Sequence, residues 1–214
     1  MFKHQKQCLR ADRAVCQLSH SFRKERVAVA STFGSNLSRI TQLILRFETV
    51  NPNEETIVRF YTAFKRHDYL TMQDCYAEKV IFYDPVFEDL VDDEVKMMWE
   101  MLCRRATDLT IEFSNVQADD EYGTCDWDAS YTFSKTHRKV SNAIRAHMRF
   151  KDAKIVEHSD QFVVSRWCRQ AFGLTGWLFG STDWFQKRVR RSAQQLLYDY
   201  MKSKQIPHAQ KNQA

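Results

Sequence analysis

The chain has 214 residues, of which 43% are hydrophobic and 13% aromatic, with only 5 Gly and 3 Pro. These values exclude a collagenous, low-complexity or wholly disordered protein and predict one folded domain with appendages. The formal net charge of +5 resides in the first 50 residues, which carry nine Lys and Arg against three Asp and Glu. Because the remainder is nearly neutral, we expect no nucleic-acid partner.

The cellular compartment follows from the absence of two patterns. No apolar run approaches the length of a membrane-spanning helix, and residues 1–20 lack the apolar stretch of a secretory signal. Six cysteines occur without CxxC or Cys/His metal spacing. We therefore expect a cytoplasmic protein with reduced, mostly buried thiols, no metal and no disulfide framework.

The first fifty residues show no sustained periodicity apart from a short helical pattern at 37–47. They end at the breaker Asn51-Pro52-Asn53. We interpret residues 1–50 as a basic, disordered extension, or as sequence that results from an upstream start codon.

Three stretches after this breaker carry helical patterns. In the first, Asn53 can cap a helix, and apolar residues then recur at i, i+3, i+4 and i+7. The second covers residues 70–77. The third follows an acidic start at 92–94, and its apolar positions are Val95, Met98, Trp99 and Leu102.

Strand patterns dominate from residue 108 onward, although one apolar strand, 80–87, precedes them and is interrupted at Asp84-Pro85. Apolar and polar residues alternate at 109–114, 126–133 and 144–151, and a last strand is expected at 154–164. We expect an α+β fold in which a curved antiparallel sheet wraps on the N-terminal helices.

The C-terminal part has its own pattern. Gly173, Gly176 and Gly180 surround a bent apolar segment, and one final helix is expected to end near Lys204. The expected organisation is thus an extension at 1–50, a domain at 51–168, a Gly/Trp segment with a C-terminal helix at 169–205, and a frayed tail at 206–214.

Two strands carry the candidate catalytic residues. His158 and Asp160 share the apolar side of the last strand, where they could transfer protons near neutral pH, or could instead satisfy each other as structural partners. Asp84 is a second candidate carboxylate, with turn formation before Pro85 as its alternative role.

Aromatic side chains are numerous enough to line an apolar pocket, although the same residues could form the core. They are Phe60, Tyr61, Trp99, Trp127, Tyr131 and Phe162. The basic final helix could lie on an anionic membrane. Since its apolar stripe is expected to dock on its own domain, we do not expect a membrane partner.

The order of these elements resembles the nuclear-transport-factor-two-like superfamily of cone-shaped α+β domains, and in particular its SnoaL-like branch, which is related to polyketide cyclases and ketosteroid isomerases. The resemblance rests on the segments IVRFYTAFKRHD, YAEKVIFYDPVFED, WDASYTF and NAIRAHMRFKDAKIVEHSDQF, and the tail RWCRQAFGLTGWLFGSTDWFQKRVRRSA is similar to that of one subgroup. It covers about three quarters of the chain.

The resemblance also implies roles for single residues. Asp84 matches the general base of the isomerases, and their oxyanion-hole tyrosine falls at Phe60, or at Tyr61 if the register shifts by one. Their protonated aspartate falls at Ala146, so steroid isomerisation is not expected. The acid/base aspartate of the cyclases resembles Asp160.

Two hypotheses follow. The first is a cofactor-free enzyme that binds a small hydrophobic carbonyl compound and moves a proton with Asp160, Asp84 and His158. The second is a non-catalytic ligand-binding or protein-interaction module. We further expect a homodimer that pairs through the outer face of the sheet, as is usual in the family, where Arg145 and Asp126 supply complementary charge.

Overall fold

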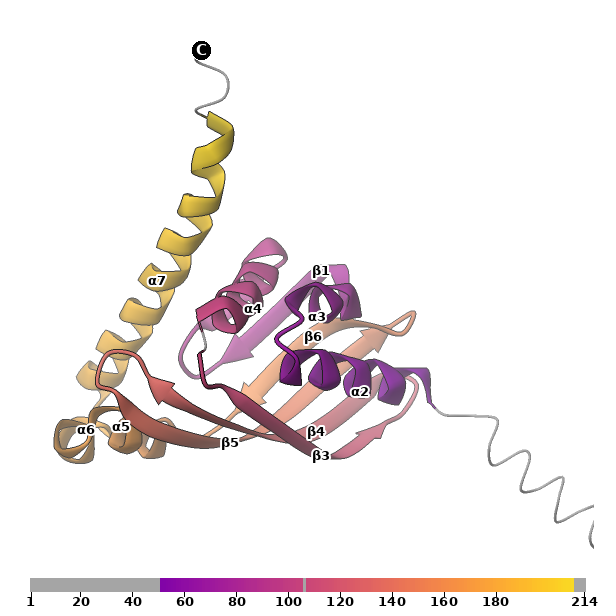
Figure 1. Ribbon diagram of the computed structural model, residues 1–214. Helices are drawn as coiled ribbons and strands as arrows, with labels where there is room; N and C mark the ends of the chain where they lie inside the picture. The colour runs from indigo at the N-terminus through magenta and orange to yellow at the C-terminus, as the bar shows by residue number, and fades with distance from the viewer. Residues whose placement is uncertain (1–50, 106, 210–214) are drawn as a thin grey trace, which may run out of the picture. The chain divides into compact units, whose positions relative to one another are not determined.

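A computed structural model describes residues 51–105 and 107–209, with side chains as far as residue 204. The expectations for residues 1–50 and 210–214 lie outside the described residues. The described part consists of three helices, a six-stranded sheet and three further helices (Figure 1).

Helix α2 (Pro52–Lys65) begins earlier than predicted, because its N-cap is Asn51, and Asn53, the predicted cap, lies inside the first turn. The side chain of Asn51 accepts a hydrogen bond from the backbone of Asn53 at 2.8 Å, and Pro52 occupies the first turn. Phe60 and Tyr61 lie on its fully buried face. Helix α2 therefore brings two of the predicted pocket aromatics into the core.

The remaining elements of the first part follow the expected order. Their bounds are α3 Tyr69–Cys75, β1 Tyr76–Asp84, β2 Glu88–Val91, α4 Asp93–Arg105, β3 Thr110–Ala118, β4 Tyr122–Phe133, β5 Arg138–Lys151 and β6 Lys154–Gln161. Strand β6 is shorter than predicted because a helix begins at Val164. The expected α+β architecture, with a helix at the C-terminal end, is confirmed.

The sheet has the order β2-β1-β6-β5-β4-β3 and is mixed rather than wholly antiparallel. Strand β1 pairs with β6 in parallel, with Phe82 beside His158 and Tyr83 beside Ser159. Hairpin signals predict only the pairing of consecutive strands, whereas four strands, β2 to β5, lie between β1 and β6 in the sequence. The parallel pair thus escaped prediction, and it places β1 next to the strand that carries His158 and Asp160.

Helices α2, α3 and α4 lie on one face of this sheet (Figure 1). The largest buried cluster forms between them and the inner sides of the strands. A second cluster surrounds Trp167 and Phe185, between β5 and the C-terminal helices. Tyr131 and Phe162 pack against both clusters and therefore lie where the two meet.

The C-terminal part contains α5 (Val164–Phe172), α6 (Leu174–Phe179) and α7 (Asp183–Ala209). Helix α7 continues to Ala209, past the expected end at Lys204. Its inner side buries Phe185, Val189 and Leu197, so its apolar stripe docks on its own domain as expected. In the part of the chain that the structure describes, no helix combines the length and apolarity needed to cross a bilayer.

Candidate functional site

Strand β6 directs His158 and Asp160 into the interior, in agreement with the alternation of the sequence. The two residues are 2% and 3% exposed, while Glu157, the residue before His158, faces solvent. The adjacent positions on β5 are Met148 and Ala146, both buried. A histidine and a carboxylate therefore lie in apolar surroundings, where each needs a hydrogen-bond partner.

A line of buried hydrogen bonds joins these residues. Trp99 Nε1 donates to Tyr76 Oη at 2.8 Å, and Tyr76 Oη lies 2.7 Å from His158 Nδ1. His158 Nε2 lies 3.2 Å from Asp160 Oδ1, which also accepts a bond of 3.1 Å from Trp127 Nε1. Five side chains from β1, α4, β4 and β6 thus form one continuous network.

The network determines which ring nitrogen of His158 carries the proton. An indole can only donate, so Tyr76 Oη receives the proton of Trp99 and must direct its own proton to Nδ1. Nδ1 is then the acceptor, and Nε2 carries the hydrogen that is donated to Asp160. Every proton in the line finds an acceptor only when His158 is neutral and Asp160 is a carboxylate.

The second oxygen of Asp160, Oδ2, has no hydrogen-bond partner among the described residues. The side chain of Asp160 keeps 4% of its exposure, whereas that of His158 is wholly enclosed. Oδ1 is occupied by two donors. Oδ2 is therefore the atom of this carboxylate that can accept a proton from a bound molecule.

Tyr61 brings a hydroxyl to the same region. Its ring lies 5.8 Å from that of Trp127 and stacks on Phe113 at 5.6 Å. The hydroxyl is buried and has no hydrogen-bond partner among the residues that the structure describes. Burial raises the pKa of Tyr61 well above its usual value, and the charge of Asp160 adds to the increase. The group is thus a neutral donor close to the Asp160 carboxylate.

Asp84 lies at the end of β1, one position beyond the pair Tyr83 and Ser159. The corresponding position on β6 is Asp160, and adjacent strands are about 4.8 Å apart. Both residues share the inward side of their strands. The parallel pairing of β1 and β6 therefore brings the two predicted carboxylates together.

The Asp84 side chain also shapes the turn that follows it. Its Oδ1 accepts backbone hydrogen bonds from Val86 at 2.8 Å and from Phe87 at 2.5 Å. Burial nevertheless raises its pKa to about 6, and the charge of Asp160 contributes to that increase. Turn formation and a raised pKa coexist, because the effect of burial on the pKa exceeds the opposite effect of the turn hydrogen bonds.

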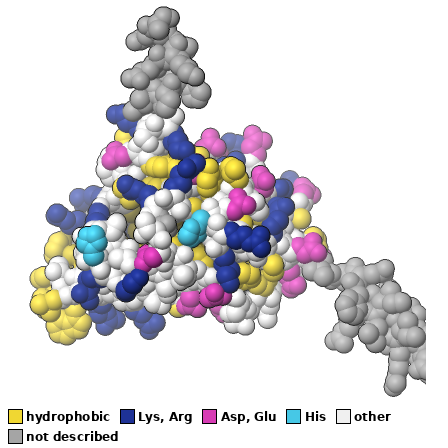
Figure 2. Space-filling view, in the orientation of Figure 1, with side chains coloured by type: hydrophobic (Ala, Val, Ile, Leu, Met, Phe, Trp, Pro, Cys, Tyr) yellow, Lys and Arg dark blue, Asp and Glu magenta, His cyan; other side chains and the backbone are white. Residues whose placement is uncertain are grey.

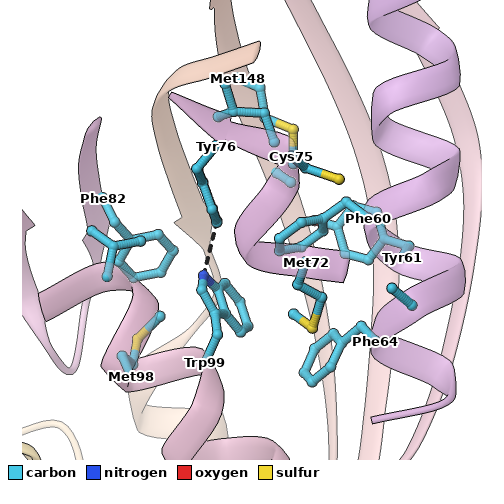
Figure 3. Packing of buried hydrophobic residues seen from close by; sticks show 14 of the residues in the cluster. Phe60, Tyr61, Phe64, Met72, Cys75, Tyr76, Phe82, Met98, Trp99 and Met148 are labelled. Atoms are coloured by element: carbon cyan, nitrogen blue, oxygen red, sulfur yellow. Dashed lines mark hydrogen bonds between the residues drawn. The ribbon is translucent and has the colours of Figure 1, made fainter. Parts of the chain in front are cut away.

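The predicted aromatic residues separate into two groups. Phe60 and Trp99 fill the interior, where their rings meet edge to face at 5.4 Å and the Tyr76 to Trp99 hydrogen bond runs beside Phe82 and Met98 (Figure 3). Such packing makes them core residues. The others, Tyr61, Trp127, Tyr131 and Phe162, lie at the end of the network that holds the carboxylates.

Two partners of this site were not predicted from the sequence. The first is Tyr76, which connects Trp99 with His158. Tyr76 lies at the same strand parity as Val80, Phe82 and Asp84, and this alternation could have identified it as an inward-facing residue. Trp167 donates from Nε1 to Tyr131 Oη at 2.7 Å. Burial raises the pKa of Tyr131, and the charge of Asp84 contributes.

Helix α7 fixes the turn next to the carboxylates. Arg190 Nε donates to the carbonyl of Pro85 at 3.0 Å, and Gln194 Nε2 donates to that of Phe87 at 3.2 Å. These carbonyls belong to the same turn whose amides bind Asp84. The C-terminal helix therefore positions the Asp84 turn from outside the domain predicted for residues 51–168.

Metal ligands were not expected in this region. No group of three or more His, Cys, Asp or Glu residues is placed to hold a metal ion within residues 51–105 and 107–204.

The four cysteines of this range are buried and unpaired, and burial raises the pKa of Cys103 and Cys125 to about 12. Thiol chemistry at neutral pH therefore has no support from these residues.

Comparisons with known proteins concern the same part of the chain. The model of the SnoaL-like domain family matches residues 57–158. An NTF2-like protein of unknown function from Burkholderia pseudomallei is 14% identical, with a TM-score of 0.50 over 57% of this chain and 98% of that one. TerC, crystallised with polyporic acid, is 11% identical, with a TM-score of 0.50 over 57% and 100%.

At these identities the likeness to solved structures concerns the fold alone. The curated proteins contain no significant match to this chain. The family match begins within α2 and ends within β6 at His158, so it includes Asp84 and ends two residues before Asp160. Residues 57–158 therefore match the SnoaL-like domain family, and the fold of this part of the chain is similar to that of an NTF2-like protein.

Proposed function

We propose that this SnoaL-like domain binds a small hydrophobic carbonyl compound beside Asp84 and Asp160 and removes a proton from the carbon next to the carbonyl. The observation that carries the proposal is the buried hydroxyl of Tyr61, which has no partner in the described part of the chain and lies near the Asp160 carboxylate. A buried donor without a partner costs about 1–3 kcal/mol, and a ligand oxygen would recover that cost.

The roles of the residues follow from their hydrogen bonds. Asp160 Oδ2 takes the proton from the carbon, and the electron pair of that C–H bond moves toward the carbonyl oxygen to form an enolate. Tyr61 donates a hydrogen bond to the enolate oxygen, where negative charge develops. His158 and Trp127 hold Asp160 through Oδ1 and keep Oδ2 directed at the ligand.

Asp84 supplies the complementary acid. With a pKa of about 6, part of its population is protonated near neutral pH, so it can return a proton to the enolate while Asp160 acts as the base. Tyr131, Trp127 and Phe162 provide apolar contacts to the ligand's carbon skeleton. The reaction in this form requires no cofactor. If Asp84 protonates a different carbon of a conjugated enolate, the net result is isomerisation; if the enolate carbon attacks a second carbonyl group of the ligand, a C–C bond forms and Asp84 protonates the resulting alkoxide, which closes a ring in an aldol-type reaction.

Hydrogen exchange into a bound ketone tests this function without knowledge of the natural substrate. The full chain would be incubated in D₂O with aryl ketones and hydroxyquinones, polyporic acid included, and deuterium incorporation measured by mass spectrometry. We expect exchange above the buffer rate that falls at least about a hundredfold in Asp160→Asn and about tenfold or more in Tyr61→Phe. Tyr122→Phe, at an exposed β4 tyrosine, is the matched control.

A non-catalytic binding module is the alternative. Its support is the packed interior around Phe60 and Trp99, which leaves the apolar end of the cone to the protein's own side chains. In that case, ligands from the same panel would raise the melting temperature of the wild type without any exchange of hydrogen. Neither binding nor exchange with the panel would contradict both forms of the proposal.

A further inference from the structure

An exposed apolar cluster covers α6 and the start of α7. It consists of Leu174, Trp177, Leu178, Phe179 and Trp184, which are 73%, 65%, 53%, 40% and 56% exposed, and we call it the α6 patch. Leu174, Trp177 and Leu178 share one side of the helix, and the rings of Phe179 and Trp184 are 5.8 Å apart. Figure 2 shows this hydrophobic cluster at the lower left of the molecule, with Lys and Arg side chains beside it.

The backbone beneath the patch is held firmly against the domain. Gly176 is buried, and a Cβ atom at this position would lie 1.9 Å from the carbonyl oxygen of Cys168 in α5. On α7, Phe185 and Val189 take the inward positions. The apolar side chains of α6 and Trp184 are therefore directed outward by a rigid support, and clusters of this kind mark interaction sites.

The surroundings of the patch are basic. Arg166, Arg169, Arg188 and Arg191 are exposed and enter no ion pair with the residues that the structure describes. The positions of Trp184, Arg188 and Arg191 follow the spacing i, i+4 and i+7, so the indole and both guanidinium groups lie on one side of α7. Asp183 is the single acidic residue between 163 and 191, and Lys187 already binds it at 2.7 Å.

These charges limit what can cover the patch. A second copy of the chain, related by a two-fold axis, would bring Arg188 and Arg191 toward their own equivalents and incur like-charge repulsion. An anionic surface would instead complement all four arginines. Exposed leucine and tryptophan side chains beside basic residues are typical of helices that lie in the headgroup region of a bilayer.

We propose that the α6 patch binds the surface of an anionic lipid bilayer. Leu174, Trp177 and Leu178 enter the boundary between headgroups and acyl chains, while Arg188 and Arg191 contact the lipid phosphates. This proposal differs from the expectation that the protein has no membrane partner. That expectation was based on the apolar stripe of the final helix, which was expected to dock on its own domain. That stripe is indeed buried, and the proposal rests on α6, which the stripe does not include.

Co-sedimentation with vesicles tests the proposal on the full chain. Vesicles of phosphatidylcholine alone are compared with vesicles that also contain phosphatidylglycerol. We expect at least about tenfold stronger partition to the anionic vesicles. Trp177→Ser/Leu178→Ser and Arg188→Glu/Arg191→Glu should each lower this partition by about tenfold or more, and circular dichroism of each variant checks that its fold is retained.

Two matched controls should leave the partition unchanged. Leu70→Ser removes a leucine of α3 that is 61% exposed, and Lys151→Glu/Lys202→Glu reverses two exposed charges elsewhere. Quenching of tryptophan fluorescence by brominated phosphatidylglycerol gives a readout on the unaltered protein. We expect the lipid to quench the exposed indoles Trp177 and Trp184 and to leave the buried Trp99 unquenched.

Three results would overturn the proposal. The first is absence of partition and quenching for the wild type. The second is undiminished partition of both patch variants, which would assign membrane binding to another part of the chain. The third is a wild-type dimer in sedimentation velocity that becomes monomeric in Trp177→Ser/Leu178→Ser, since the patch would then bind a second copy.

Discussion

Asp84 and Asp160 occupy neighbouring positions of two parallel strands, one step beyond the pair Tyr83 and Ser159. The charge of Asp160 contributes to the raised pKa of Asp84, although burial is the larger cause. Two carboxylates on the same side of adjacent strands disfavour double ionisation, so one of them holds a proton more readily than an isolated aspartate. This relationship gives the site an acid and a base of the same residue type.

The substitution Asp84→Asn tests the raised pKa through stability. The folded-state pKa of about 6 lies above the ordinary value of 3.8, so the folded protein holds this proton more tightly than the unfolded chain. Wild-type stability therefore falls through this group as pH rises from about 4 to about 6. Asparagine keeps an oxygen that can accept the turn hydrogen bonds, and it does not ionise. The unfolding free energy of Asp84→Asn, relative to that of the wild type, should therefore rise by up to about 3 kcal/mol between these pH values.

Urea unfolding at pH 4.5, inside this transition, and at pH 7.5, above it, measures most of this change in the relative stability of the two proteins. Asp128→Asn, at an exposed aspartate of β4, serves as the control and should show a much smaller change. If the stability of Asp84→Asn relative to wild type is the same at both pH values, the pKa of Asp84 is not raised.

Two tyrosines that differ in their hydrogen bonds provide a second prediction. Tyr61 Oη has no partner among the described residues, so Tyr61→Phe should raise stability by up to about 1–3 kcal/mol. Tyr76 Oη accepts from Trp99 and donates to His158, so Tyr76→Phe should cost about 1–3 kcal/mol. Equal losses of unfolding free energy in the two variants would contradict the network.

Much of this arrangement could be predicted from single strands and helices. The alternation of β6 placed His158 and Asp160 on one inward side, and the periodicity of α2 and α4 identified Phe60 and Trp99 as buried. These are local properties that follow from the period of each element. The α+β class followed from the change of period along the chain.

Long-range pairing could not be predicted in the same way. The neighbourhood of Asp84 and Asp160 depends on the parallel contact between β1 and β6, for which no hairpin signal exists. The position of Arg190 against the Pro85 carbonyl likewise depends on the tertiary path of α7. The dimer stays a prediction, and Arg145, expected to reach a partner's charge, binds Asp126 of its own chain at 2.7 Å.

A third prediction concerns the tautomer of His158. In long-range ¹H–¹⁵N spectra of the folded protein near neutral pH, Nδ1 should have the chemical shift of an unprotonated ring nitrogen and Nε2 that of a protonated one. The reason is that Tyr76 donates to Nδ1 while Asp160 accepts from Nε2. If Nδ1 alone were protonated, it would donate to Tyr76 Oη, and Nε2 would have no hydrogen to donate to Asp160. This result would contradict the proposed direction of the hydrogen bonds. Exposed His147 provides an internal reference.

The hairpin between β5 and β6 supports the last prediction. Asp152 and Ala153 both have positive φ, 52° and 55°, as a two-residue type I′ turn requires. Glycine adopts this conformation without strain, whereas alanine at Ala153 incurs a cost of roughly 1–2 kcal/mol. The carbonyl of Ala153 accepts a hydrogen bond of 2.9 Å from Thr56 Oγ1, which fixes the turn on α2 and does not depend on the alanine side chain.

We therefore expect Ala153→Gly to stabilise the protein by about 0.5–1 kcal/mol, because relief of strain exceeds the larger entropy of glycine in the unfolded chain. Thermal and urea unfolding of the full chain measure this gain. Ala143→Gly, at an exposed β5 residue of ordinary strand conformation, is the matched control and should destabilise. A loss of stability in Ala153→Gly as large as that of the control would mean that the turn is not strained, and the register of His158 and Asp160 would then need another support.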